Sequence, residues 1–170
     1  MIKAKYTFLF LLLTSICFAQ SGSASASVTA NVITPITIIT TGSIDFGDVI
    51  VMPNPYQVTK SPESGSRHEV QGNPNSSVTI SFNPITLDNF NWVAQHGGTS
   101  GTITFIPEVK HTGTNPNYVN PITVTSGGVY QLTDVGGIGK LYLWVGGAIN
   151  VNANQPVGYY TGTFVINVSY

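Results

Sequence analysis

Two alternating stretches near the C-terminal end constrain the fold more than any other part of the chain. Aliphatic side chains fall on odd positions between residues 141 and 151, and apolar side chains fall on even positions between residues 160 and 170. A period of two over this length is typical of β-strands with one buried face. Turn-forming residues lie between the two stretches. The pattern predicts two strands joined by a turn, with the last strand central to the core.

Short alternating segments continue along the rest of the chain, separated by Gly and Pro. Further strands are expected at residues 28–32, 36–39, 44–51, 56–59, 67–71, 78–82, 102–106, 121–125 and 129–133. The apolar parity slips near Gly47, which predicts a bulge. Residues 88–101 are expected to be irregular, and no segment shows helical periodicity over three turns. The pattern predicts an all-β, single-domain, antiparallel immunoglobulin-like β-sandwich, with a closed barrel as the alternative.

The first 19 residues have the layout of a secretory signal peptide. Lys3 and Lys5 precede a short apolar run, which ends in small residues before Gln20. The run is short for a transmembrane helix, so an uncleaved anchor is the less favoured alternative. Cleavage near Ala19 predicts a product that is secreted, periplasmic or displayed at the cell surface, without membrane insertion after signal removal.

Signal removal also changes the composition of the mature chain. Cys17 is the only cysteine, so the mature chain forms no disulfide. Ile16 stands where a lipoprotein signal carries a small residue, which argues against lipidation. We expect a flexible linker of small residues at 20–27 and the sandwich domain at 28–170.

Charge is scarce, at 8% of residues, and scattered. Loss of Lys3 and Lys5 leaves four of the six basic residues against seven acidic ones. No basic patch suits nucleic acid, and no basic amphipathic segment suits a membrane surface.

The sequence shows no catalytic or metal-binding motif. Ser66 and His68 share a strand face but have no recognisable third partner that would orient the imidazole. Glu108 and His111 would share a face only on a helix, which Pro107 disfavours. Convergence of the three histidines on a metal is a less favoured alternative. We therefore expect no enzyme activity, no metal and no cofactor, with a hydrolase as the least favoured class.

Aromatic side chains offer a candidate binding surface. Tyr142 and Trp144 have the parity opposite to the aliphatic residues of their strand, so they face away from the predicted core. With Trp92 and Tyr130, they form a possible surface that stacks on a glycan or on a neighbouring subunit. Alternatively, a loop such as residues 88–101 covers them.

Three stretches together resemble a family of secreted bacterial domains, the domain of unknown function 4402. They are VTANVITPITI at 28–38, SIDFGDVIV at 43–51 and the ending at 150–170. The ending carries the family pattern at Gly158, Tyr160, Gly162, Phe164, Ile166, Val168 and Tyr170. Residues 84–135 depart from the family pattern. The resemblance implies a secreted β domain and no known activity.

A more distant resemblance is to fimbrial and spore-coat-type subunits assembled by chaperones and ushers. These are secreted immunoglobulin-like sandwiches with an alternating C-terminal strand. Many carry a disulfide, which the mature chain cannot form. The resemblance implies a strand-pairing segment at Val28, Ala30, Val32, Phe164, Ile166, Val168 and Tyr170, whose first part is either donated to a neighbour or paired within its own domain.

We therefore expect a secreted or cell-surface, non-enzymatic structural or adhesive protein, of the kind of a fimbrial subunit. Its expected partners are further copies of itself or other surface subunits. The alternative is a carbohydrate-binding surface module, with a glycan as the partner.

Overall fold

A computed structural model describes residues 23–170 of the chain. The predicted signal peptide lies outside the described residues. Ile33–Tyr170 form one compact unit, and the other unit ends at Val32. Residues 23–32 are exposed and have no regular secondary structure, so the strand predicted at residues 28–32 is wrong. A single extended segment gains no ladder hydrogen bonds without a neighbouring strand, which explains the failure of the pattern there.

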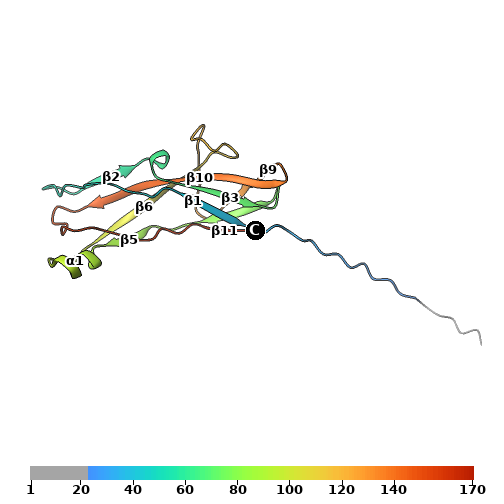
Figure 1. Ribbon diagram of the computed structural model, residues 1–170, viewed down its shortest axis with the longest axis horizontal. Helices are drawn as coiled ribbons and strands as arrows, with labels where there is room; N and C mark the ends of the chain where they lie inside the picture. The colour runs from blue at the N-terminus through green and yellow to red at the C-terminus, as the bar shows by residue number, and fades with distance from the viewer. Residues whose placement is uncertain (1–22) are drawn as a thin grey trace, which may run out of the picture. The chain divides into compact units, whose positions relative to one another are not determined.

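Within the compact unit, eight strands form the larger antiparallel sheet (Figure 1). Five of them follow one another across the sheet, in the order β1 (Thr37–Thr41), β3 (Ser66–Gly72), β10 (Ile138–Val151), β6 (Thr102–His111) and β5 (Ile85–Asp88). Two short strands pair with β10, namely β2 (Tyr56–Lys60) and β9 (Thr133–Val135), and β7 (Ile122–Thr123) pairs with β6.

Three further strands form the smaller antiparallel sheet, in the order β11 (Asn167–Ser169), β4 (Ser77–Ser81) and β8 (Gly128–Gln131). Buried side chains of both sheets share one apolar cluster, to which Val70 and Leu143 contribute from the larger sheet and Val78 and Ile80 from the smaller. Two packed antiparallel sheets confirm the predicted all-β sandwich and not the barrel alternative.

Two short helices complete the described elements, a 3₁₀ turn η1 (Pro62–Ser64) and α1 (Phe90–His96). Neither helix has the length and apolar character needed to cross a bilayer, and residues 23–170 contain no other. The irregular stretch expected at residues 88–101 therefore contains a helix. At seven residues, α1 is too short to show a helical period in the sequence.

Asn89 holds this region in place, since it is fully buried and bonds to three backbone groups. Its Nδ2 donates to the carbonyl oxygens of Thr99 and Val157, at 3.2 and 3.1 Å, and its Oδ1 accepts from the N–H of Gly101 at 2.7 Å. The side chain thereby ties both ends of the α1 region to the segment after β10.

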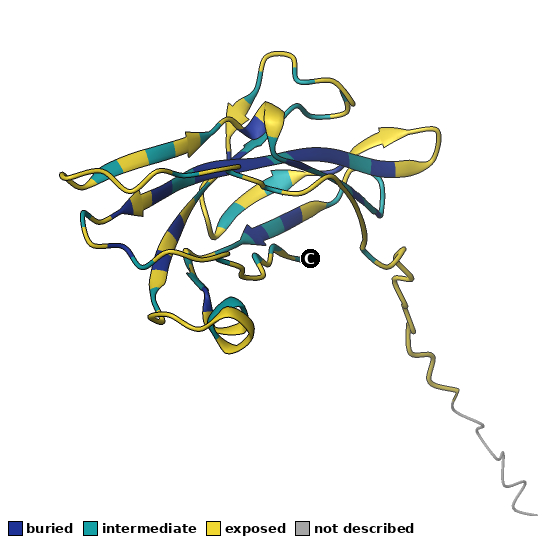
Figure 2. Ribbon diagram, turned by 60° about the vertical axis from the view of Figure 1, so that its left-hand side comes forward, coloured by how far each residue is buried: buried dark blue, intermediate teal, exposed yellow. Residues whose placement is uncertain are grey.

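Strand β10 confirms the odd-position pattern read from the sequence. Its odd aliphatic residues are all at most 4% exposed: Leu141, Leu143, Val145, Ile149 and Val151. Figure 2 shows the strand buried along most of its length. On one edge, β10 pairs with β3 through Gly139–Val145 and with β2 through Gly147–Val151. On the other edge, it pairs with β6 and β9.

The change of partner on the first edge occurs at Gly146, which the chain between β2 and η1 approaches closely. A Cβ at Gly146 would lie 2.2 Å from the carbonyl oxygen of Lys60 and 2.5 Å from the nitrogen of Pro62. Both neighbours are backbone atoms, so they cannot move aside as a flexible side chain would. The position therefore requires glycine for space.

Most other predicted strands are confirmed. The segments at 36–39, 56–59, 67–71, 78–82, 102–106, 121–125 and 129–133 overlap β1, β2, β3, β4, β6, β7 and β8. β6 runs further than predicted, through Pro107 to His111. Pro107 lies between the part of β6 that pairs with β5 and the part that pairs with β7, where the missing N–H leaves no ladder bond unmade.

The strand predicted at residues 44–51 is absent from both sheets, although its inward parity is correct. Ile44, Phe46 and Val49 are half-buried and pack on an apolar cluster. The parity changes at Gly47, whose φ is 65° and whose N–H donates to Oδ1 of Asp45 at 2.8 Å. A side-chain-capped turn, and not a bulge, therefore shifts the alternation.

The strand predicted at residues 160–170 is much shorter than expected. Only β11 pairs in a sheet, and Thr161 forms an isolated bridge with Asp88. β11 lies at the edge of the smaller sheet, and the expected contact of this segment with the core is made by the half-buried Phe164, Ile166 and Val168. Alternation reflects one buried face, and it appears whether or not the backbone has a partner.

We predict that Gly146→Ala lowers the free energy of unfolding by about 3 kcal/mol, because its methyl group would overlap backbone atoms of the β2–η1 connection. Gly136→Ala is the control, since nothing lies within 4 Å of its Cβ position. That control carries only the cost of a positive φ, about 1 kcal/mol. Urea unfolding of both variants checks this, and equal losses would contradict the steric explanation.

Candidate functional site

The predicted aromatic surface lies on the outer face of the larger sheet, where β3 and β10 pair. Tyr142 stands opposite Glu69 and Trp144 opposite Arg67 in the register of the two strands. Tyr142 is only 8% exposed and Trp144 is half-buried. These rings are therefore covered, which corrects the expectation of an exposed glycan-stacking surface.

The loop at residues 112–118, and not the alternative loop at residues 88–101, covers these rings. The Nε1 of Trp144 donates to Oγ1 of Thr112 at 3.0 Å, and the ring of Tyr118 meets the Trp144 ring edge-on at 5.4 Å. The N–H of Tyr142 donates to the carbonyl oxygen of Gly113 at 2.8 Å. The loop thus satisfies both the indole and the strand backbone.

Arg67 completes this aromatic cluster. Its guanidinium carbon lies 5.8 Å from the ring centroid of Tyr142 and 5.9 Å from that of Trp144. Its Nη1 also donates to the carbonyl oxygen of Pro116 at 3.1 Å. Cation–π attraction of this kind stabilises by about 0.5–1 kcal/mol at exposed sites and by more where water is excluded. The arrangement holds the loop on the sheet.

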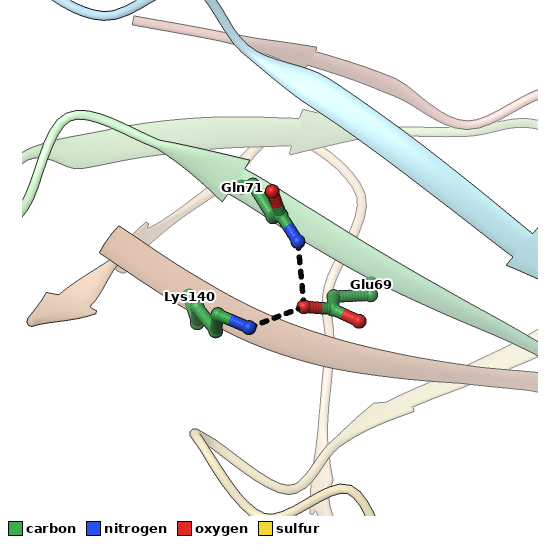
Figure 3. Close-up of polar contacts among 3 residues, drawn as sticks. All are labelled: Glu69, Gln71 and Lys140. Carbon is green, nitrogen blue, oxygen red and sulfur yellow. Dashed lines mark hydrogen bonds and ion pairs between the residues drawn. The ribbon is translucent and has the colours of Figure 1, made fainter. Parts of the chain in front are cut away.

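The same outer face carries a polar group next to the aromatic cluster (Figure 3). Oε1 of Glu69 accepts from Nζ of Lys140 and from Nε2 of Gln71, each at 2.8 Å. The hydrogen bond from Lys140 holds the pKa of the Glu69 carboxyl below its usual value. The contact with Lys140 joins β3 to β10, and Gln71 supports the same carboxylate from within β3, which gives the face a structural role.

Trp92 and Tyr130 lie on other elements. Trp92 is on α1 and stacks on the ring of His96, with centroids 4.8 Å apart. Tyr130 is on β8, meets the ring of His111 edge-on at 5.4 Å, and accepts a hydrogen bond from the N–H of Thr125. The structure therefore does not bring the four predicted rings together into one surface.

The C-terminal residues of the predicted strand-pairing segment contact the core. Phe164, Ile166 and Val168 are half-buried and pack on the cluster shared by the two sheets. Tyr170 is 44% exposed, and its hydroxyl donates to the carbonyl oxygen of Thr34 at 2.6 Å. This hydrogen bond fixes the start of the compact unit beside its end.

The N-terminal residues of that predicted segment are exposed. Val28 is 92% and Val32 is 91% exposed, and Ala30 between them is exposed as well. They make no part of either sheet. We call residues 28–33 the tail segment.

A hollow that sequence reasoning missed lies beside the two alternating segments that remain unpaired. It consists of two adjoining cavities of about 450 and 410 Å³. Residues 43–51 and 157–164 contribute most of its lining, together with side chains of β5, β6 and β10. Five residues line both cavities: Ile44, Phe46, Leu87, Tyr159 and Tyr160. We call this hollow the edge groove.

One end of the edge groove carries the Ser66–His68 pair. Oγ of Ser66 lies 3.0 Å from Nε2 of His68, and Oγ1 of Thr40 lies 2.9 Å from Nδ1 on the other side of the ring. The third partner that the sequence did not reveal is thus the hydroxyl of Thr40, which contacts the His68 imidazole where a catalytic triad would have a carboxylate. Ser66 is 5% exposed, so its hydroxyl is enclosed by the fold. The arrangement binds β1 to β3 through the imidazole.

Residues 23–170 contain no group of three His, Cys, Asp or Glu side chains placed to hold a metal. The three histidines lie on β3, α1 and β6, in different hydrogen-bonded settings. Convergence of the histidines, the less favoured alternative, is therefore absent from the described structure.

We predict that the protein loses stability on mild acidification. Burial lowers the pKa of His68 and of His111 below the usual histidine value. Near and below about pH 6.5, the imidazoles of the unfolded chain bind more protons than those of the folded chain. The free energy of unfolding therefore decreases as the pH is lowered, until the lower pKa values of the folded state are reached. Urea unfolding between about pH 7.5 and 5 measures the slope.

The variants His68→Gln and His111→Gln each remove one of the two titrating groups. Each should flatten the pH dependence, and the double variant should flatten it most. A double variant with the slope of the parent protein would show that these imidazoles are not responsible.

Comparison with known proteins supports the first of the two resemblances read from the sequence, the one to the domain of unknown function. A family model described as Domain of unknown function (DUF4402) matches residues 36–170. The tail segment precedes the matched region. Searches of curated proteins and of solved structures gave no match. The family match covers well over half of the chain, and the protein belongs to the family of domain of unknown function DUF4402.

Proposed function

We propose that this protein is a secreted or cell-surface, non-enzymatic structural subunit, which joins other copies of itself by β-strand pairing in the manner of a fimbrial subunit. Its subunits would associate through backbone hydrogen bonds and through burial of apolar side chains between them. The signal-peptide layout of residues 1–19 supports export, and the adhesive or structural role follows from the features of the tail segment.

The observation that carries the proposal is the exposure of the tail segment. Val28, Ala30 and Val32 alternate with polar residues, as one face of a strand would, yet they are exposed to solvent. The segment has no charged residue. An uncharged, alternating segment rich in β-branched residues favours addition to an open sheet edge, and native monomers usually avoid such a segment.

The position of the tail segment also suits contact between chains. Pro35 lies between it and β1, and proline cannot donate a ladder hydrogen bond. Tyr170 anchors the chain at Thr34, directly before that proline. Pro35 therefore separates the tail segment from β1, and the hydrogen bond from Tyr170 fixes the chain at Thr34.

We predict that residues 20–170 form oligomers whose size grows with protein concentration, as measured by sedimentation equilibrium. Val32→Asp should weaken this association by about 100-fold, because a carboxylate would be buried in the subunit contact. Thermal unfolding of the variant should match that of the parent, since Val32 is outside both sheets.

Val129→Asp is the matched control, because Val129 is also an exposed valine, at 67%, but lies on β8. It should leave the association unchanged. A protein that stays monomeric at every concentration would contradict the proposed function.

A further inference from the structure

We infer that the edge groove binds the tail segment of a second copy of this chain as an added β-strand. This inference rests on the proposed function, and it names the site where two subunits meet. Three segments alternate as strands do, namely residues 28–32, 44–51 and 160–166. None of the three belongs to either sheet, and only Thr161 makes an isolated bridge.

Two of these segments provide the walls of the edge groove. Residues 43–51 and residues 157–164 both contribute to its lining. Their inward parity is already that of strands, since Phe46 and Phe164 are half-buried while Asp45 and Thr163 are exposed. Extended backbone without a ladder partner is a template for strand addition. A strand inserted beside these segments would supply a ladder partner.

The floor of the edge groove is apolar. Buried Ile103, Ile149 and Val151 line one cavity, and buried Phe105 lines the other. They form the second apolar cluster of the domain, against which the partly buried Ile44, Phe46, Leu87 and Phe164 pack. Apolar side chains that enter the groove would exclude water from these partly buried side chains. The groove thus favours an occupant with small apolar residues at every second position.

The tail segment has that pattern. Val28, Ala30 and Val32 would face the floor, and Thr29 and Asn31 would face solvent. The absence of charge in the segment means that no ion has to leave water on insertion. The side chains of Asp45 and Asp48 lie on one wall, and they meet no acidic residue of the tail segment.

A second copy supplies the occupant. In the single chain, Val28 and Val32 are 92% and 91% exposed, and residues 28–32 belong to neither sheet. An exposed strand-like segment without a ladder partner favours addition to another molecule. A disulfide between two differently labelled copies distinguishes this arrangement from entry into the groove of the same chain.

Cross-linking between two single-cysteine variants tests the assignment, because the only natural cysteine, Cys17, lies in the predicted signal peptide. One variant of residues 20–170 carries Asn31→Cys or Thr29→Cys. The other carries Thr163→Cys, an exposed position on a wall of the groove, and is labelled with ¹⁵N. Neighbouring strands bring outward side chains within disulfide range. Mass spectrometry then identifies the disulfide-linked mixed dimer.

The control partner carries Val129→Cys, which is exposed and lines neither cavity. We expect at least one tail cysteine to form about tenfold more mixed dimer with Thr163→Cys than with Val129→Cys. Adding Val32→Asp to the tail variant should remove that excess. Oligomers that form without preferential linkage to Thr163→Cys would overturn the groove assignment and leave the proposed function standing. Failure to form oligomers would overturn both.

Discussion

Burial of one face of β10 is the constraint on which the rest of the domain depends. Its odd side chains reach the cluster shared with the smaller sheet, and its backbone pairs with strands along both edges. A strand that is hydrogen-bonded on both edges must keep its register, since a slip of one residue would turn Leu141 and Leu143 to solvent. β3 and β2 pair with the same edge of β10, and the partner changes at Gly146. Because Gly146 has no side chain, it leaves space for the connection between β2 and η1.

The even face of β10 shows why the candidate binding surface could not be settled from the sequence. Parity correctly placed Tyr142 and Trp144 away from the core, but parity does not say what lies outside a sheet. The loop at residues 112–118 carries no strand or helix pattern, and its attachment depends on its contacts with Arg67, Tyr142 and Trp144. Such contacts join residues far apart in the sequence. The only sequence signal was the position of Arg67 on a strand predicted to have an outward face, which is too common to identify a cation–π partner.

The predicted fold class and most strand positions follow from alternation, and the errors share one physical cause. Alternation records which side chains face an apolar surface, whereas a strand also needs a neighbour for its backbone. At residues 78–82 the sequence period and the pairing agree, and the prediction is confirmed. At residues 44–51 the period is present, Phe46 faces inward, and no neighbour exists. The helix α1 escaped prediction for another reason, since its position depends on the buried amide of Asn89 and not on a repeated pattern.

The three strand predictions that lack a partner in the single chain are related by geometry. Two of the segments line the edge groove, and the third is exposed and uncharged. A sequence that specifies one structure normally makes local pattern and tertiary pairing agree. Here they disagree at all three segments in the single chain, and insertion of one copy's tail segment into the groove of another would give these segments backbone partners. On this argument, the sequence encodes strands of an assembly, and the single chain shows them before their partners are present.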